Sequence, residues 1–297
     1  MPKINDPRKP LAKKTSARTM LDQLTTVKEH DSGGLHMSLY GRGKTGKTRL
    51  ISTFPKPIAI LGAEDGTKSI QNVDGVYFVR VVLNKPKQKG VKYILIDELQ
   101  QFVEEVRDSD FKTVAVDTAS HLQDLYLAQI LGLDKIPEQK DWGMATIKEY
   151  GELGLKMKTV LWEILGLKQN VVITAHEKNF NEGNESDSLL PSIGSALGSS
   201  TSAWLNGAVD YVCQTFIREE TKTVKKKGLK GKVIVKKEKT GRCEYCLRTG
   251  PSPIYITGFR LPPESILPDV IVNPTYRKIM DVIEGENGNV GSESEEG

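Results

Sequence analysis

Residues 35–53 read LHMSLYGRGKTGKTRLIST, and the prediction of the fold begins with them. The apolar start, residues 35–40, has the character of a buried strand, and the end, Thr48 to Thr53, has helical spacing. Between these two elements the residues GRGKTGKT, which begin at Gly41, match the pattern GxxxxGK[ST] in full. The motif requires this context, a strand before it and a helix after it, so the match predicts a phosphate-binding loop (P-loop).

The residue types in this loop suit the phosphates of ATP. Glycines let successive backbone N–H groups converge on phosphate oxygens, and the start of the following helix adds its dipole. Lys47 is expected to reach the β- and γ-phosphates, and Thr48 is expected to offer its hydroxyl to Mg²⁺. The predicted nucleotide-binding residues are Gly41, Arg42, Gly43, Lys44, Thr45, Gly46, Lys47 and Thr48.

The rest of the chain predicts an α/β fold. Short apolar runs, separated by helical patterns, occur at residues 57–63, 75–82, 112–117 and 170–175. Buried strands that alternate with helices form a mainly parallel sheet with helices on both faces. After Trp204 the pattern changes, and antiparallel strands are expected at about 209–217, 231–238 and 253–258.

Length and composition exclude several classes of protein. The chain has 297 residues, of which 38% are hydrophobic and 27% charged, enough for one large or two small globular domains. No run of 18 apolar residues occurs, and residues 1–20 lack the apolar centre of a secretion signal. Three cysteines do not provide a disulfide framework for a chain of this length. We therefore expect a cytoplasmic protein without membrane association.

The net charge of +4 conceals three regions of different character. Residues 1–18 carry six Lys/Arg and one Asp, whereas residues 281–297 carry six Asp/Glu and no base. Residues 222–239 contain nine lysines and one Glu. Such a lysine run can neutralise phosphates, or it can protect an exposed strand edge from pairing. The predicted organisation is a basic flexible arm (1–33), a core domain (34–280) with a Lys-rich hairpin at about 218–240, and an acidic disordered tail (281–297).

Two acids compete for the place beside the Mg²⁺ of a P-loop. Asp97 ends the apolar run YILID, but the apolar period continues through Val106, which favours a helix there. Asp117 ends the β-branched run TVAVD, after an acidic break and before a new helical pattern. We therefore predict Asp117 and Thr48 as the metal-binding pair, with Asp97 as the alternative.

The general base must come from another strand, because residue 118 is Thr and no glutamate adjoins Asp117. Glu64 follows the apolar strand 58–61, so its side chain is expected at the carboxyl edge of the sheet, where ligands of open α/β sheets bind. A carboxylate there can accept a proton from an attacking water. We predict Glu64 as the base and Glu98 as the next candidate. The alternative interpretation of Glu64 is a solvated acid in a turn.

This order of motifs resembles that of RecA-like ATPases. More closely, residues 35–262 resemble the phage nucleotide-binding proteins of the RecA-like, Sak-type single-strand annealing group. The segments that carry the resemblance are GRGKTGKT, AVDTASHLQDL, Trp142 to Gly151, VVITAHEKN and GFRLPP. The resemblance implies a RecA-like P-loop NTPase core that acts as a slow or DNA-stimulated ATPase, with ATP and Mg²⁺ as cofactors. It also implies a location in the host cytoplasm if a phage encodes the chain.

The same resemblance implies a sensor, two loops that face DNA, and partners. His176 stands where RecA-like proteins carry a Gln that senses the γ-phosphate, so it joins Lys47 and Glu64 as a predicted catalytic residue. Loops near 132–142 and 177–202 would face single-stranded DNA in recombination, annealing or replication. The second loop is acidic, so the lysine run and the N-terminal arm are expected to grip the strand. A homo-oligomer and a single-strand-binding protein are further expected associations.

Two other functions share the P-loop. A nucleotide-gated adaptor, such as a helicase loader, would use ATP for assembly without binding DNA itself. A small-molecule or nucleotide kinase is less favoured, because the sequence shows no Arg-rich lid.

Cys243 and Cys246 form a CxxC pattern that lacks the second half of a zinc site. Cys213 and the four histidines show no paired spacing, and structural zinc normally takes four ligands. An ordinary hairpin is therefore the favoured interpretation. Arg260 and Lys239 are candidates for a cation that acts across a subunit boundary, and the sequence does not select between them.

Overall fold

The structure is a computed structural model, and it describes residues 33–64, 66–87, 90, 92–136, 145–180, 191–227, 233–261 and 265–285. The side chains of residues 225–227 and 233–237 lie outside this description. The chain divides into two units, residues 1–33 and 34–297, and the fold described below is that of the second. The predicted basic arm therefore lies outside the described residues, apart from Gly33.

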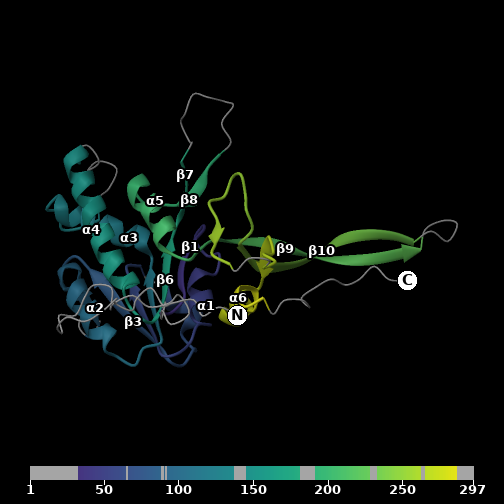
Figure 1. Ribbon diagram of the computed structural model, residues 1–297, viewed down its shortest axis with the longest axis horizontal. Coiled ribbons are helices and arrows are strands. Elements are labelled where there is room, and N and C mark those ends of the chain that lie inside the picture. The colour runs from purple at the N-terminus through teal and green to yellow at the C-terminus, as the bar shows by residue number, and fades with distance from the viewer. Residues whose placement is uncertain are drawn as a thin grey trace, which may run out of the picture. The chain divides into compact units, whose positions relative to one another are not determined.

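A ten-stranded sheet organises the described part of the domain (Figure 1). Its path is β12-β10-β9-β1-β6-β5-β2-β3-β4, and β11 pairs with β9. Pairing is parallel from β9 through β1 to β4, and antiparallel among β9, β10, β11 and β12. The strands are β1 (His36–Tyr40), β2 (Ile58–Gly62), β3 (Val76–Val82), β4 (Tyr93–Leu95), β5 (Thr113–Asp117), β6 (Asn170–Ala175), β9 (Tyr211–Lys227), β10 (Val233–Arg248), β11 (Gly258–Phe259) and β12 (Val270–Val272).

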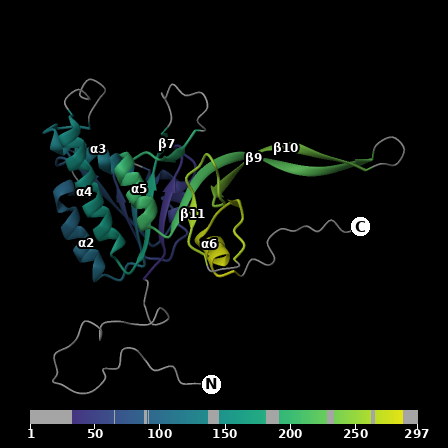
Figure 2. The same ribbon diagram turned by 45° about the horizontal axis from the view of Figure 1, so that its top comes forward.

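Helices cover both faces of this sheet (Figure 2). On one face, α2 (Leu99–Arg107), α3 (Ala119–Ile130), α4 (Ile147–Leu165) and α5 (Ser199–Ala208) contribute to one apolar core. On the other face, α1 (Lys47–Ile51) and α6 (Tyr276–Ile283) contribute to a second core. Neighbouring strand residues serve opposite cores, because side chains alternate along a strand: Val114 and Val116 belong to the first core, Ala115 to the second.

This architecture confirms the predicted fold class. The sheet is mainly parallel, both faces carry helices, and antiparallel strands follow near the C-terminus. The five strands β9-β1-β6-β5-β2 lie side by side, so the strand that leads into the P-loop is flanked by β6 and β9. The arrangement matches a RecA-like α/β core. The central strands are covered on both faces, which explains the near-continuous apolar runs of the sequence. All five residues of β2 and of β5 are buried.

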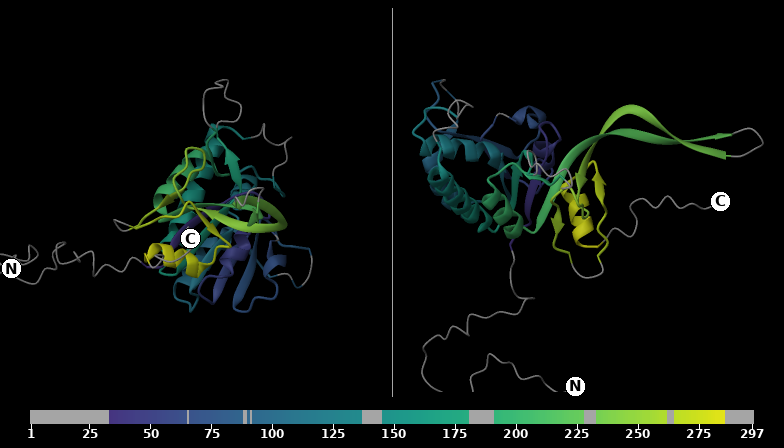
Figure 3. Two further views of the ribbon diagram at one scale, coloured as in Figure 1. Left: turned by 90° about the vertical axis from the view of Figure 1, so that its right-hand side faces the viewer. Right: turned by 90° about the horizontal axis from the view of Figure 1, so that it is seen from above.

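The Lys-rich hairpin differs in length from the prediction. The strands predicted at 209–217 and 231–238 are parts of the longer β9 and β10, which pair from Val233↔Lys227 to Arg248↔Gln214 with one irregularity between Lys239 and Cys243. Much of the lysine run therefore lies in paired strands, where Thr, Val and Ile between the lysines favour extended backbone. Figure 3 shows this hairpin extending beyond the strands that flank it.

Three further boundaries were predicted wrongly. Residues 93–95 form strand β4, and helix begins only with the turn η3 (Ile96–Glu98) that leads into α2. Of the strand expected at 253–258, only Gly258 lies in a strand, namely β11. Strand β12 was not predicted. The predicted tail starts at residue 281, inside α6, whose Val282 is buried.

The described parts of the long polar segment 177–202 contain regular elements, against the expectation of a single loop. β7 (Glu177–Asn179) and β8 (Ile193–Ser195) form a two-stranded antiparallel sheet, and α5 begins at Ser199. Residues 181–190 lie outside the described residues, as do residues 137–142 of the other predicted DNA-facing loop.

Candidate nucleotide-binding site

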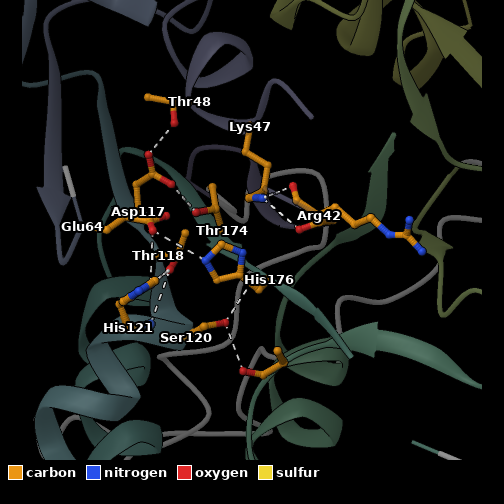
Figure 4. A network of polar contacts seen from close by, with 12 residues as sticks. Arg42, Lys47, Thr48, Glu64, Asp117, Thr118, Ser120, His121, Thr174 and His176 are labelled. Atoms are coloured by element: carbon orange, nitrogen blue, oxygen red, sulfur yellow. Dashed lines mark hydrogen bonds and ion pairs between the residues drawn. The ribbon is translucent and has the colours of Figure 1, made fainter. Parts of the chain in front are cut away.

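The predicted site residues converge at the carboxyl ends of β1, β2, β5 and β6 (Figure 4). A cavity of about 520 Å³ lies there, and its lining includes Lys47, Thr48, Glu64, Asp117 and His176. These residues come from four separate parts of the chain. They meet because parallel strands present all their carboxyl ends at the same edge of the sheet.

The P-loop has little room for side chains at two of its glycines. A Cβ atom on Gly41 would lie 2.3 Å from the backbone oxygen of Thr215 on β9. Gly46 has a φ of +90° and caps α1, and a Cβ there would lie 2.7 Å from the ring of Tyr245 on β10. The sequence pattern thus reflects the packing of the loop against β9 and β10 as well as its chemistry.

Lys47 is held inside the loop by its own backbone. The ammonium group donates hydrogen bonds to the carbonyl oxygens of Gly41 and Arg42, both at 2.9 Å, and the residue is 6% exposed. Burial lowers the pKa of Lys47, and the negative charges of Asp117, Glu64 and Glu177 oppose this effect. An ammonium has three donors, so one remains for an anion in the cavity.

Thr48 and Asp117 form the second pair that was predicted. The Thr48 hydroxyl donates to Asp117 Oδ2 at 2.7 Å, and the Thr174 hydroxyl on β6 donates to Oδ1 at 2.6 Å. Asp117 is only 4% exposed, so these hydroxyls replace water at its carboxylate. A hydroxyl and a carboxylate beside a phosphate-binding loop are the oxygen donors that Mg²⁺ prefers. The residues present therefore fit the Mg²⁺ that P-loop nucleotide binding normally uses.

Glu64 lies between two histidines. Its Oε2 is 3.3 Å from Nδ1 of His121, in the first turn of α3, and 3.6 Å from Nε2 of His176, directly after β6. The two imidazole rings contact each other edge-on, with centroids 5.3 Å apart. Burial, and then the charge of Lys47, lowers the pKa of His176, while Glu64 acts in the opposite direction.

Hydrogen bonds to neighbouring segments position both histidines. Thr118 caps α3 and accepts a hydrogen bond from the His121 backbone N–H, which sets where the His121 side chain begins. The His176 backbone N–H donates to the Ser120 hydroxyl, which in turn donates to the carbonyl of Ala196 after β8. The site is thereby bonded directly to the segment that follows the β7–β8 sheet.

A second chain of contacts connects the P-loop with the hairpin. Arg42 Nε pairs with Glu177 Oε1 at 2.8 Å, and Gln214 Nε2 on β9 donates to the other oxygen of Glu177 at 3.2 Å. Arg248 Nε on β10 donates to Gln214 Oε1 at 3.0 Å. These consecutive hydrogen bonds therefore link the loop to β10.

The competing candidates lie elsewhere. Asp97 lines another cavity and accepts a hydrogen bond from Gln129, and Glu98 accepts one from the Leu95 backbone N–H at its own helix start. The two cations proposed for a subunit boundary have partners within the chain. Arg260 pairs with Asp210 at 2.8 Å, and Lys239 pairs with Glu219 at 2.6 Å.

The CxxC pattern does not form a metal site in the described residues. Cys246 is buried and Cys243 is exposed, as a spacing of three on strand β10 requires, because odd spacings face opposite sides of a strand. In the described residues, one group of three or more potential ligands does converge, namely Glu64, His121 and His176.

His121 and Thr174 are the site residues that the sequence did not reveal. The distances between His121 and His176, and between Asp117 and Thr174, exceed 50 residues in the sequence, so no local spacing marks them. The signal that could have found His121 is its position four residues after Asp117, in the first turn of the helix that leaves the site.

A P-loop between β1 and α1, with Thr48 bonded to an acid at the end of β5, defines a RecA-like P-loop ATPase core. The AAA domain family (AAA_24) matches residues 34–261, and the chain belongs to this family. Membership in a P-loop ATPase family implies nucleotide binding. No sequence among curated proteins matches the chain.

Several solved structures are similar to this chain. The flagellar accessory protein FlaH from Methanocaldococcus jannaschii has 14% identity and a TM-score of 0.31 over 73% of this chain and 77% of that one. The KaiC-like protein PH0186 from Pyrococcus horikoshii has 11% identity and a TM-score of 0.34 over 82% and 90%. The RadB recombinase has 13% identity and a TM-score of 0.33 over 73% and 88%. Likeness at this level says nothing about function.

Among the described helices, none has the length and apolar character needed to cross a membrane.

Proposed function

We propose that this protein binds ATP with Mg²⁺ and hydrolyses it slowly, and that it uses this cycle on single-stranded DNA in phage recombination, annealing or replication. One observation carries the ATPase part of the proposal: a single cavity brings together the ammonium of Lys47, the hydroxyl of Thr48 and the carboxylates of Asp117 and Glu64. These are the groups that bind the phosphates, hold Mg²⁺ and activate the attacking water in P-loop ATPases.

Each residue of the cavity has its own role in the proposed reaction. The loop N–H groups and Lys47 bind phosphate oxygens, while Thr48 and Asp117 would hold Mg²⁺. Bound Mg²⁺ neutralises charge on the phosphate oxygens. Glu64 accepts the proton of the attacking water, and His176 beside it contacts the terminal phosphate. The ammonium of Lys47 donates to two backbone oxygens and makes no ion pair with a described residue, so its third donor can bind the anion.

The DNA part rests on charge. Residues 222–239 carry nine lysines and one acid, and single strands are bound through their phosphates and bases without sequence preference. Two cations of the hairpin are paired with acids, Lys239 with Glu219 and Arg218 with Glu244. We therefore expect DNA contacts at the other lysines of residues 222–239.

Two substitutions test the ATPase. Lys47→Ala should abolish ATP binding, measured by calorimetry, because it removes the cation at the phosphates. Glu64→Gln should leave binding intact and lower phosphate release by about 100-fold or more, the typical size of a general-base contribution. Glu98→Gln is the matched control, since that carboxylate accepts a hydrogen bond at the start of its own helix. If Glu64→Gln hydrolyses ATP like the wild type, the base is misassigned, and a loss of hydrolysis in Glu98→Gln would then identify Glu98 as the base.

Filter binding to single-stranded DNA with and without ATP tests the rest. At about 50 mM salt phosphate contacts are strong, so the wild type should bind and its affinity should change with ATP. Absence of binding at this salt concentration would favour the adaptor function instead.

A further inference from the structure

The cluster of Glu64, His121 and His176 has a composition that ATP hydrolysis alone does not require. Two imidazoles and one carboxylate offer one donor atom each, and these atoms all lie within 4.8 Å of one another. All three side chains are about one-third exposed, so an ion could reach them from solvent. Exposure of this degree also leaves room for a water or a further ligand.

The distances suit an ion better than direct hydrogen bonds. Separations of 3.3 Å and 3.6 Å between Glu64 Oε2 and the two ring nitrogens are long for charge-assisted hydrogen bonds, which are about 2.7–2.9 Å. Two donors bound at about 2.0–2.1 Å to a tetrahedral Zn²⁺ are about 3.3–3.4 Å apart. The third pair, the two imidazole nitrogens, lies within 4.8 Å, so side-chain shifts of up to about 1.5 Å would complete the geometry.

The donor types separate this site from the Mg²⁺ site. Imidazole nitrogens select Zn²⁺ and similar transition metals, whereas Thr48 and Asp117 offer only oxygens. Three protein ligands and one open position are the pattern of metal sites that bind water or substrate. Glu64 and His176 line the nucleotide cavity, so an ion bound to them would lie beside it.

The neighbourhood supports this assignment. The backbone of His176 is fixed by Ser120, and that of His121 by the Thr118 cap, so both ligands start from defined positions. The Thr118 hydroxyl lies 3.2 Å from His121 Nδ1 and competes with an ion for that nitrogen, but it can rotate away and keep its bond to the backbone N–H.

We propose that Glu64, His121 and His176 form a binding site for Zn²⁺ or a chemically similar transition-metal ion, which restrains ATP hydrolysis by occupying the carboxylate of Glu64. The effect on hydrolysis depends on the proposed role of Glu64 as base, whereas the binding of the metal ion does not depend on that role. A carboxylate that is bound to a cation is a poor proton acceptor. ATP binding at Lys47 and Thr48 should continue, so the metal would hold the protein in its ATP-bound form.

The test begins with the metal alone. In a Cys243→Ser background, which removes the one exposed cysteine, the protein is titrated with Zn²⁺ by calorimetry and with Co²⁺ by visible absorption, without nucleotide and with excess Mg²⁺. One ion per chain should bind, with the absorption of a four-coordinate Co²⁺ site. His121→Asn and His176→Asn should each weaken binding by about 100-fold or more, because losing a ligand costs at least as much as losing a group that supports one, which is about 10- to 100-fold. His36→Gln, at the start of β1, is the matched control and should bind like the background protein.

Turnover is measured separately, as the ratio of rates with and without a slight excess of Zn²⁺ over protein. The ratio should fall well below one in the background protein and return toward one in His121→Asn. No binding of Zn²⁺ or Co²⁺, or binding that both histidine variants retain, overturns the metal site. If one histidine variant does not fold, the other still tests the metal site, and so does Glu64→Gln, which should also bind Zn²⁺ more weakly. An inactive protein that binds Zn²⁺ through these residues would overturn the ATPase proposal and leave the site standing.

Discussion

Backbone sterics constrain the single residues of the P-loop as strongly as phosphate chemistry does. A Cβ at Gly41 would approach both the backbone oxygen and the hydroxyl of Thr215, at 2.3 and 2.4 Å. A Cβ at Gly43, two residues on, would meet nothing within 4 Å. The two glycines therefore make different contributions, although the motif treats them as equals.

Substituting these two glycines tests how closely the P-loop packs against β9. Gly41→Ala should lower the free energy of unfolding by about 1–3 kcal/mol, because β9 backbone must move to admit the methyl group. Gly43→Ala should change it by less than about 0.5 kcal/mol. Urea denaturation of both variants measures the difference. Equal stability of the two would show that β9 does not pack against the loop in this way.

Asp117 combines a structural and a metal-binding role, and a conservative change separates them. Asp117→Asn keeps one oxygen acceptor for the hydroxyls of Thr48 and Thr174, so the fold should survive with a loss of about 1 kcal/mol. The negative charge is gone, so the gain in ATP affinity on adding Mg²⁺ should shrink by about tenfold or more. Calorimetry with and without Mg²⁺ measures this gain. Asp97→Asn is the control, and a Mg²⁺ effect that disappears there instead would reverse the assignment.

The residues that the sequence revealed are those marked by their neighbours. Lys47 and Thr48 stand in a contiguous motif, and Glu64 and Asp117 each end an apolar strand, so the parallel-sheet rule placed them at one edge. His121 has no such mark. Its role depends on which helix face meets β2 and β6, and this is decided by packing across the sheet rather than by spacing along the chain.

At the scale of elements, most of the parallel strands were predicted closely, although β4 was taken for helix, whereas the antiparallel strands were predicted only in part. Strands buried on both faces are continuous apolar runs, and β1, β2, β3, β5 and β6 agree with their predicted positions to within one residue or two. β9 and β10 carry lysines in much of their length, so composition alone suggested a turn. Their strand character comes from pairing with each other, an interaction that single-sequence patterns do not show.

The hairpin is the element whose removal tests DNA binding. Thr221 and Lys239 are paired across β9 and β10, so Asn-Gly can replace residues 222–238 and close a shorter hairpin. This removes eight lysines and one glutamate. Affinity for single-stranded DNA should fall by more than tenfold at low salt, while ATP binding stays unchanged. Filter binding at several salt concentrations measures both the affinity and its salt dependence.

Charge and shape of the hairpin need a separate control. Lys→Gln at residues 225, 226, 227 and 230 keeps the length of the hairpin, and the slope of log affinity against log salt should decrease by about 0.7 for each phosphate that the lysines no longer neutralise. If the shortened hairpin loses binding and the glutamine variant does not, the hairpin contributes surface rather than charge. If neither loses binding, the DNA-binding surface lies elsewhere.

At the scale of the whole molecule, the opposite charges of the chain's regions suggest competition. Residues 1–280 carry a net charge of +10, which follows from the total of +4 and the six acids in residues 281–297. An acidic segment in the same chain as a basic one has an effective concentration that can reach about the millimolar range. It would then compete with DNA phosphates for the lysines of residues 222–239. A solubilising terminus without a partner is the alternative.

Deletion of the acidic tail must respect α6, because Val282 belongs to the second core. Removing residues 286–297 keeps α6 and takes away four of the six carboxylates, Glu286, Glu293, Glu295 and Glu296. Affinity for single-stranded DNA should rise by several-fold at low salt, and the difference should vanish as screening lengths fall toward about 8 Å and below. Glu→Gln at the same four positions should reproduce the effect if charge is its cause. Unchanged affinity in both variants at low salt would mean that the tail does not compete for the lysines, since electrostatic competition is strongest under that condition.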